Sequence, residues 1–271
     1  SNSTQRTMLD VIIALVPVSI AAVILFGIPA LLVIAVCVIS AVVGEAVFNI
    51  AVKKEQTIGD LSAVVTGLIL ALNLPANVPL WQAAVGSVFA IVIVKGIFGG
   101  LGKNIVNPAI AARVFMLIAF GSMTKAAFPT GLDSVSGATP LADLANDKAG
   151  NLLDLFLGKC GGALGETCTV ALLIGGIYLL VRKVISWHIP VAFIGTTFLF
   201  TFAVEGWNLE TTLAWVLSGG LVLGAFFMAT DYVTSPTTAK GKLIFGIGAG
   251  VITVLIRFWG GYPEGVSFAI L

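Results

Sequence analysis

A polar stretch near residue 139 has the composition of a site for covalent modification. The pattern D-x-x-S-G-A-T brings together Asp133, Ser136, Gly137, Ala138 and Thr139. Thr139 supplies a nucleophilic hydroxyl, and the small residues before it leave the backbone open to a modifying enzyme. Asp133 is suited to help that enzyme, or its metal ion, to recognise the site. The structural alternative is a turn leading into a helix at Thr139-Pro140, since proline is favoured at the first helical position.

The same pattern resembles the acceptor sequence on which flavin transferases form a phosphoester between FMN and a threonine hydroxyl. A bare S-G-A-T would be a weak signal, but here it extends to D-x-x-S-G-A-T-P-L-A. The resemblance implies that Thr139 carries FMN covalently and that Asp133, Ser136, Gly137 and Ala138 belong to the recognition sequence.

The rest of the chain is strongly apolar. Of its 271 residues, 58% are hydrophobic and 10% charged, and the mean hydropathy is +1.09. Soluble domains contain about 25% charged residues. Apolar runs recur at close to the roughly 20 residues that span a bilayer, and they are continuous rather than alternating, which favours helices. We therefore predict an all-α polytopic membrane protein in contact with lipid. The net charge of +1, without a basic cluster, gives no support for nucleic-acid binding.

About ten spans are predicted, with glycine and proline marking most of their ends. They are 8–26, 29–51, 58–74, 79–98, 105–121, 166–182, 188–205, 211–230, 241–259 and a run that begins near 263. The first run lacks a convincing cleavage site, so we read it as a retained helix rather than a signal peptide. The last run is expected to be truncated, as in a fragment of a longer protein.

The distribution of lysine and arginine predicts the orientation. With the N-terminus in the cytoplasm, the cytoplasmic segments hold most of the basic residues, and the short outer loops 75–78 and 206–210 hold none. Arg257, near the outer end of its span, is the exception. The long loop 122–165 would then lie outside the cytoplasm.

The two halves of the chain look related. Residues 61–73 and 95–100 are loosely similar to 217–231 and 257–261. Five spans per half would place the copies in opposite orientations, as in many transporters. The predicted organisation is a first five-helix repeat at 1–121, an extracytoplasmic loop at 122–165 and a second repeat at 166–271. The alternative is that glycine- and leucine-rich membrane sequence resembles itself by chance.

Two asparagines after a glycine-rich break form a second candidate site. Asn104 and Asn107 are spaced to share one helix face, and amide side chains both donate to and accept from a flavin ring edge. The alternative is structural: Asn104 caps the helix, and Asn107 with Pro108 shapes its start.

Three ionisable residues fall within predicted spans: Glu45, Arg113 and Asp231. Such residues are costly in lipid and are usually functional or paired. The two carboxylates lie near the predicted cytoplasmic side and suit a hard cation such as sodium. Arg113 would either neutralise one of them or sit beside an anionic flavin. Structural pairing within the bundle is the alternative.

The chain resembles the D-type membrane component of the Rnf complex, the ferredoxin:NAD oxidoreductase of bacterial membranes. It is also similar to the homologous B-type component of the sodium-pumping NADH:quinone reductase. The resemblance covers almost the whole chain, and the Pro-Leu after Thr139 favours the Rnf component. Besides the S-G-A-T loop, the resemblance rests on Asn73-Leu74-Pro75, residues 79–84, residues 98–109 and residues 227–231.

This resemblance implies a urea-transporter-like fold of two inverted repeats in the bacterial inner membrane. It also implies noncovalent riboflavin near Asn104 and Asn107 and a sodium entry route at Glu45 and Asp231. The sequence has no dinucleotide fingerprint and no cysteine cluster for an iron–sulfur centre. We therefore expect one subunit of an ion-translocating enzyme, working with a second covalent-FMN subunit and iron–sulfur subunits. The coupling ion, sodium or proton, stays open. A passive small-solute channel is the alternative, but it leaves the Thr139 loop unexplained.

Overall fold

The computed structural model describes residues 2–124, 127–129, 139–146, 150–262 and 264–271. Asp133, Ser136, Gly137 and Ala138 of the predicted flavin loop lie outside the described residues. Within the described part every named element is helical, and the remaining pairing is an isolated antiparallel bridge between Ala127 and Gly162. The predicted all-helical class is confirmed.

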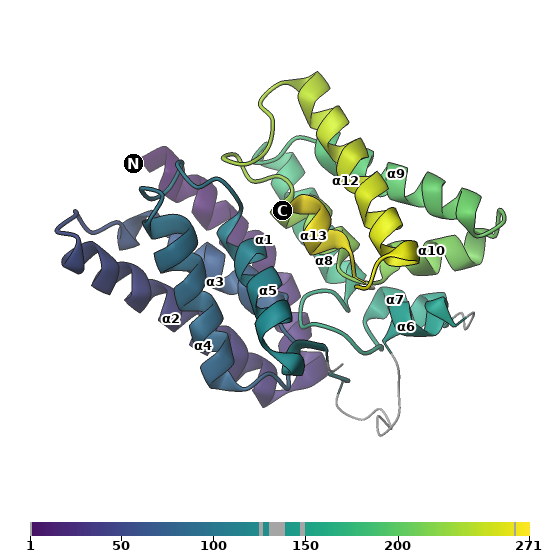
Figure 1. The fold of residues 1–271 in the computed structure, drawn as a ribbon, viewed down its shortest axis with the longest axis horizontal. Helices are drawn as coiled ribbons and strands as arrows, with labels where there is room; N and C mark the ends of the chain where they lie inside the picture. The colour runs from purple at the N-terminus through teal and green to yellow at the C-terminus, as the bar shows by residue number, and fades with distance from the viewer. Residues whose placement is uncertain (1, 125–126, 130–138, 147–149, 263) are drawn as a thin grey trace.

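The first half of the chain forms one group of helices (Figure 1). Its elements are α1 (Asn2–Phe26), α2 (Ile28–Ala51), the 3₁₀ turn η1 (Ile58–Asp60), α3 (Ser62–Leu72), α4 (Leu80–Val88), its π-helical continuation η2 (Phe89–Gly96), α5 (Pro108–Ala119) and the 3₁₀ turn η3 (Gly121–Thr124).

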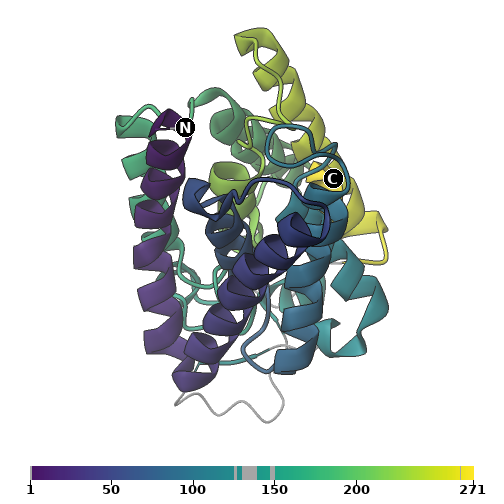
Figure 2. The same cartoon turned by 90° about the vertical axis from the view of Figure 1, so that its left-hand side faces the viewer.

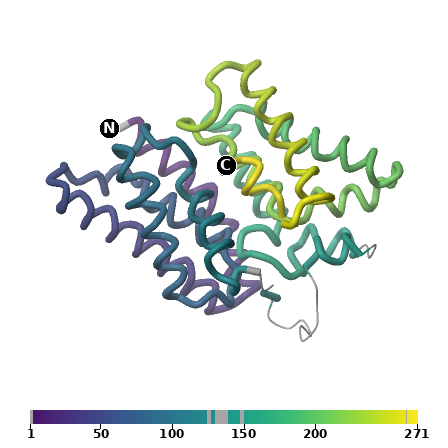
Figure 3. Tube along the Cα trace, in the orientation of Figure 1, coloured from purple at the N-terminus to yellow at the C-terminus, as the bar shows by residue number. Residues whose placement is uncertain are grey.

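The second half forms a second group, which the chain reaches through two short helices (Figure 3). Its elements are α6 (Pro140–Ala145), α7 (Leu152–Leu157), α8 (Thr169–Val181), α9 (His188–Val204), α10 (Leu209–Leu217), α11 (Leu221–Leu223), the π-helical η4 (Gly224–Met228), α12 (Ala239–Trp259) and α13 (Val266–Ile270). Helix α1 packs against α8, and α13 packs against α5, so the two groups meet along these pairs.

Each predicted span has a helical segment near it, but the segments differ in length. Among the described residues, three helices are long and apolar enough to cross a membrane: 3–26, 28–51 and 239–259. A bent pair, 209–217 with 221–228, would make a fourth span, and five apolar helices are shorter. The third and fifth helices begin at Ser62 and Pro108, later than the predicted 58 and 105, because a 3₁₀ turn and a glycine-rich loop precede them.

The prediction of one continuous helix over 211–230 is wrong. Helices α10 and α11 are bent by 62° at a break over residues 218–220. Gly219 and Gly220 have φ angles of 71° and 74°, in the left-handed region that glycine adopts without the Cβ clash of other residues. The two glycines therefore end one helix and start the next inside a single apolar run.

Close helix packing depends on small residues at the contacts. A Cβ on Gly67 of α3 would lie 2.8 Å from the carbonyl oxygen of Cys37 in α2, and one on Gly175 of α8 would collide with the carbonyl of Ala14 in α1. Figure 2 shows α1 and α2 meeting at the turn that joins them and diverging from there. The outward face of α2 exposes large apolar side chains, including Ile28, Ile39, Val47 and Ile50, as lipid contact requires.

Candidate functional site

Thr139 lies at the wall of a cavity of about 360 Å³ between the two groups of helices. We call it the Thr139 cavity. Its lining includes Pro75, Arg113, Leu117, Thr139, Glu166 and Glu264. These residues come from the loop between α3 and α4, from α5, from the start of α6, from the loop before α8 and from the loop before α13. Small-molecule sites usually measure roughly 300–1,000 Å³, so this cavity is large enough for a cofactor.

Thr139 is the N-cap residue of α6. Its Oγ1 accepts a hydrogen bond from the Ala142 amide at 3.3 Å, and Pro140 occupies the first helical turn. The structural alternative for this residue, a helix start, is therefore confirmed. It does not exclude modification, because the cap uses a lone pair of Oγ1 and leaves the hydroxyl hydrogen replaceable by a phosphoryl group.

Arg113 is a buried cation with unused donors. It lies in the middle of α5, 7% exposed, and its Nη2 donates to Oε2 of Glu264 at 2.8 Å. Its Nε and Nη1 are buried and have no hydrogen-bond partner among the described residues. The expectation that Arg113 neutralises Glu45 or Asp231 is wrong, because Glu264 is its partner. Its place in the wall of the Thr139 cavity fits the other expectation, a position beside a flavin.

The sequence analysis missed the two glutamates of this cavity. Glu264 accepts from the Ser267 hydroxyl at 2.7 Å in addition to Arg113. Glu166 accepts from the Ala163 amide at 2.9 Å. The sequence signal that could have indicated Glu166 is its position as a single carboxylate between a glycine-rich turn and an apolar run. Glu264 likewise follows a pair of glycines, Gly260 and Gly261.

Unlike Arg113, Arg257 has a hydrogen-bond acceptor for each of the three nitrogen groups of its guanidinium. Its Nε, Nη1 and Nη2 donate to the carbonyl oxygens of Glu264, Trp215 and Ser218 at 3.0, 2.7 and 2.9 Å. The last two carbonyls end α10, where a cation also interacts favourably with the helix dipole. The break in the eighth segment thus explains why a basic residue stands near the predicted outer end of a span.

Cys160 lies in the loop between α7 and α8 and lines the Thr139 cavity. It is a free thiol, as is Cys168. Burial disfavours the thiolate and raises the pKa of Cys160 to about 12. At neutral pH this side chain is therefore a protonated, weakly reactive wall of the cavity.

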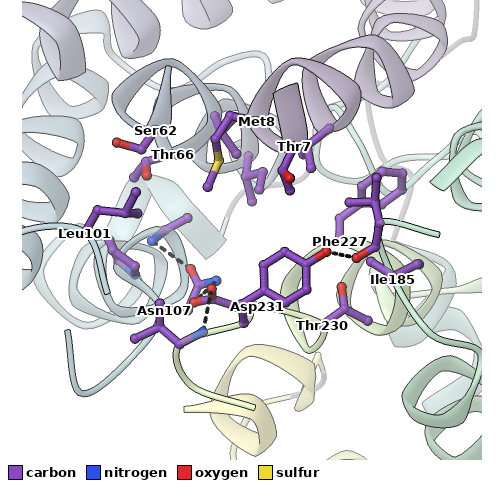
Figure 4. A pocket seen from close by; sticks show the side chains of 18 of the residues that line it. Thr7, Met8, Ser62, Thr66, Leu101, Asn107, Ile185, Phe227, Thr230 and Asp231 are labelled. Atoms are coloured by element: carbon purple, nitrogen blue, oxygen red, sulfur yellow. Dashed lines mark hydrogen bonds between the residues drawn. The ribbon is translucent and has the colours of Figure 1, made fainter. Parts of the chain in front are cut away.

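A second, smaller cavity of about 100 Å³ contains the asparagine motif (Figure 4). We call it the Asn107 cavity. Its polar lining includes Ser62, Lys95, Asn104, Asn107, Thr230 and Asp231. The structure therefore brings the two predicted asparagines together with one of the two predicted carboxylates, which lies more than 100 residues away in the sequence.

Asn107 caps α5, which confirms that it shapes the start of the helix. Its Oδ1 accepts from the amides of Ala109 and Ile110 at 3.0 and 3.3 Å, and its Nδ2 donates to Oδ2 of Asp231 at 3.4 Å. Asn104 is not the cap, and its Nδ2 donates to the carbonyl of Val106 at 3.0 Å.

Asp231 is held by the loop that follows η4. Besides the Asn107 amide, its carboxylate accepts from the Val233 amide at 3.3 Å and from the Thr234 hydroxyl at 3.2 Å. These donors fix the carboxylate at the wall of the Asn107 cavity.

Glu45 is in a buried ion pair. Its Oε1 lies 2.6 Å from Nζ of Lys95, and both side chains are 5% exposed. Thr57 also donates to Oε1 at 2.9 Å, and Lys95 donates to the Ser62 hydroxyl. Lys95 lines the Asn107 cavity, whereas Glu45 is not among its lining residues. The structural alternative of pairing within the bundle is thus found for Glu45.

Helix α5 connects the two cavities. Asn107, Pro108 and Ala109 line the Asn107 cavity, whereas Arg113 and Leu117 line the Thr139 cavity. Ala109 and Arg113 are one helical turn apart, about 6 Å along the axis. Successive turns of one helix therefore line the two cavities.

Comparison with known proteins identifies the family. Residues 1–271 match the model of the NQR2, RnfD, RnfE family. The chain belongs to this family. It is 50% identical to the D component of the Na⁺-translocating ferredoxin:NAD⁺ oxidoreductase complex of Acetobacterium woodii, and the match covers the whole chain and 86% of that protein. It is 43% identical to the D component of the proton-translocating complex of Clostridium ljungdahlii, over the whole chain and 87% of that protein.

A third relative in the NQR2, RnfD, RnfE family is the D component of the ion-translocating oxidoreductase complex of Stutzerimonas stutzeri, 38% identical over the whole chain and 87% of that protein. The predicted resemblance to the D-type component of the Rnf complex is confirmed. The names of the first two relatives differ in the coupling ion, sodium in one and proton in the other.

Proposed function

We propose that this chain is the flavin-carrying membrane subunit of an ion-translocating ferredoxin:NAD oxidoreductase complex. Thr139 holds FMN through a phosphoester, and the flavin lies in the Thr139 cavity. The observation that carries the proposal is the combination of a replaceable threonine hydroxyl with a buried guanidinium that has two unpartnered nitrogen groups in the same cavity. Relatives that match the whole chain and are named as components of such complexes support it.

The residues of the cavity fit a flavin in size and chemistry. The volume of about 360 Å³ lies within the range for small-molecule sites. Leu117, Leu141 and Tyr262 supply apolar walls that exclude water from the ring, and Arg113 supplies donors for its acceptor atoms. When bound, FMN supplies the acceptance and release of electrons, while the protein positions it and sets its electrostatic surroundings.

Electrons must reach and leave this chain through other subunits. We therefore propose partners that include a second covalent-FMN subunit and iron–sulfur subunits, in the bacterial inner membrane. In this arrangement the chain is a part of the enzyme and not a complete oxidoreductase.

Flavin attachment is tested by expressing the chain with a flavin transferase and recording in-gel fluorescence after denaturation. Thr139→Val removes the hydroxyl and should abolish the fluorescent band. Thr167→Val is the matched control, because Thr167 lines the same cavity and is 1% exposed. It should keep the band. A fluorescent Thr139→Val chain would exclude attachment at this residue.

We also propose two inverted repeats, with the N-terminus in the cytoplasm and loop 122–165 outside. Two corresponding contacts support this. Lys95 donates to the hydroxyl of Ser62, and Arg257 donates to the carbonyl of Ser218 at 2.9 Å. Each serine is the second residue of the first similar segment in its half, and each basic residue is the first residue of the second similar segment. Reporter fusions after Val52 and after Trp207 test the orientation, and equal reporter activity from both would contradict it.

A second, noncovalent flavin near Asn104 and Asn107 is a further proposal. The Asn107 cavity of about 100 Å³ is smaller than the roughly 300 Å³ expected for such a ligand. Binding would therefore require lining side chains such as Leu101 to move. Riboflavin released from the native complex, and less of it from Asn107→Ala, would support the site. Finding only covalently bound FMN in the native complex, without free riboflavin, would count against it.

The same cavity supports a proposal for cation handling at Asp231. Carboxylate and carbonyl oxygens suit sodium, and a cavity of this size accepts a small cation without rearrangement. For Glu45, the neighbouring Lys95 already supplies a positive charge, so a cation there would have to displace the ammonium.

A further inference from the structure

Two buried arginines differ in how many of their hydrogen-bond donors have partners. Arg257 uses its three nitrogen groups on backbone carbonyls, whereas Arg113 uses Nη2 alone, on Glu264. Both guanidinium groups are buried, with residue exposures of 6% and 7%. The unpartnered nitrogens of Arg113 are therefore a local feature of this side chain and not a general property of buried arginines in this protein.

We propose that Nε and Nη1 of Arg113 donate to the acceptor edge of the flavin ring attached to Thr139, and that this contact raises the flavin's reduction potential. The inference rests on the proposed function, because it requires FMN in the Thr139 cavity. Its first support is the donor inventory. A guanidinium carries five N–H groups in a rigid planar fork. Buried donors are nearly always paired, so those on Nε and Nη1 indicate a ligand with acceptor atoms.

The second support is the match in chemistry. The pyrimidine side of a flavin ring presents a row of nitrogen and carbonyl oxygen acceptors, which the edge of a planar guanidinium can meet. An electron delivered by a partner subunit adds one negative charge to the ring, and no bond to the protein forms or breaks. A fixed positive charge at hydrogen-bond distance stabilises that charge more strongly in a cavity than in water. Arg113 therefore favours the reduced over the oxidised flavin.

Glu264 has the opposing effect. Its Oε2 lies 2.8 Å from Nη2, so it orients the fork and also offsets part of the positive charge. Ser267 holds the other oxygen of the same carboxylate at 2.7 Å. Removing the charge of Glu264 while keeping its shape should therefore strengthen the field of Arg113 at the flavin. The two residues are expected to shift the potential in opposite directions, which a general loss of structure would not do.

The test uses the full chain carrying FMN on Thr139, with the midpoint potential measured by spectroelectrochemistry and FMN content measured by intact mass. Arg113→Gln should keep the FMN and reduce the ratio of reduced to oxidised flavin at a fixed potential by tenfold or more, about 59 mV for a one-electron couple. Arg113→Lys, which keeps the charge without the planar fork, should give a smaller decrease. Glu264→Gln should raise the potential. Arg182→Lys is the control and should leave the potential unchanged, because Arg182 is 57% exposed in its pair with Asp10 and does not line the cavity.

Three results would overturn the inference. One is an unchanged potential in Arg113→Gln with normal FMN content. A second is reduced FMN content with an unchanged potential in the loaded fraction, which would place Arg113 on the phosphate instead of the ring. The third is a lowered potential in Glu264→Gln. If Arg113→Gln does not fold, Arg113→Lys and Glu264→Gln still decide between the outcomes. Absence of FMN from the unaltered chain would refute the proposed function itself, and with it the inference.

Discussion

The buried pair of Glu45 and Lys95 provides a test of whether Glu45 is structural. Each side chain is 5% exposed, and the charged atoms lie 2.6 Å apart. Lys95→Met would leave the Glu45 carboxylate buried with the Thr57 hydroxyl as its remaining donor among the described residues. Removing one member of a buried pair typically costs about 3–5 kcal/mol, because the other charge stays uncompensated. We expect a similar loss for Glu45→Gln.

The double variant Glu45→Gln/Lys95→Met should recover most of this loss, because neither charge is then left alone. Each kcal/mol shifts the unfolding temperature by roughly 2–4 °C in proteins of 150–250 residues, so each single variant should melt roughly 6–20 °C lower. Thermal unfolding in detergent, followed by tryptophan fluorescence, measures the shifts. Arg182→Gln is the control, because Arg182 is 57% exposed in its pair with Asp10. It should melt close to the temperature of the unaltered protein, because exposed ion pairs contribute little to stability.

Additive shifts would contradict this account. If the double variant melts lower by the sum of the two single shifts, Glu45 and Lys95 do not stabilise each other, and the carboxylate would be free for another partner such as a cation.

Three further predictions follow from single contacts. In the whole complex, Asp231→Asn should raise the sodium concentration needed for half-maximal turnover at normal flavin content, and an unchanged requirement would make Asp231 structural. Gly219→Ala should lower the unfolding temperature by several degrees, since its Cβ would collide with Leu141 and lie 2.8 Å from Nη2 of Arg257; the control Gly248→Ala, with open space around it, should change little. Iodoacetamide at pH 8 should alkylate Cys160 far more slowly than an exposed cysteine, because burial raises its pKa to about 12 and keeps the thiolate scarce; peptide mass spectrometry checks this, and labelling at the rate of an exposed thiol would contradict it.

The helical class could be predicted from the sequence because continuous apolar runs report directly on burial in lipid. The sequence could not show whether Gly219 and Gly220 break the helix or lie within a continuous one, since hydropathy does not change across residues 218–220. Helix α7 was not predicted, and the start of α6 was predicted only as the structural alternative at Thr139-Pro140. They are six residues long each and lie in a polar segment.

At the candidate sites, features set by neighbouring residues could be predicted, whereas contacts between residues far apart in the sequence could not. The sequence predicted that Asn107 shapes the helix start, because Asn-Pro has a strong local preference there, but it offered Asn104 instead of Asn107 as the cap. The pairing of Arg113 with Glu264 joins residues 151 positions apart, and that of Lys95 with Glu45 joins residues 50 apart. No periodic pattern links such positions. Their partners depend on how α5 packs against α13 and how η2 packs against α2, which only the assembled fold shows.

Peptide mass spectrometry of the native protein decides whether Thr139 carries FMN. We expect a peptide spanning residue 139 whose mass is increased by one FMN minus water, with fragmentation placing the increase on Thr139. The same peptide from the native complex at its unmodified mass, or the increase on another residue, would contradict it.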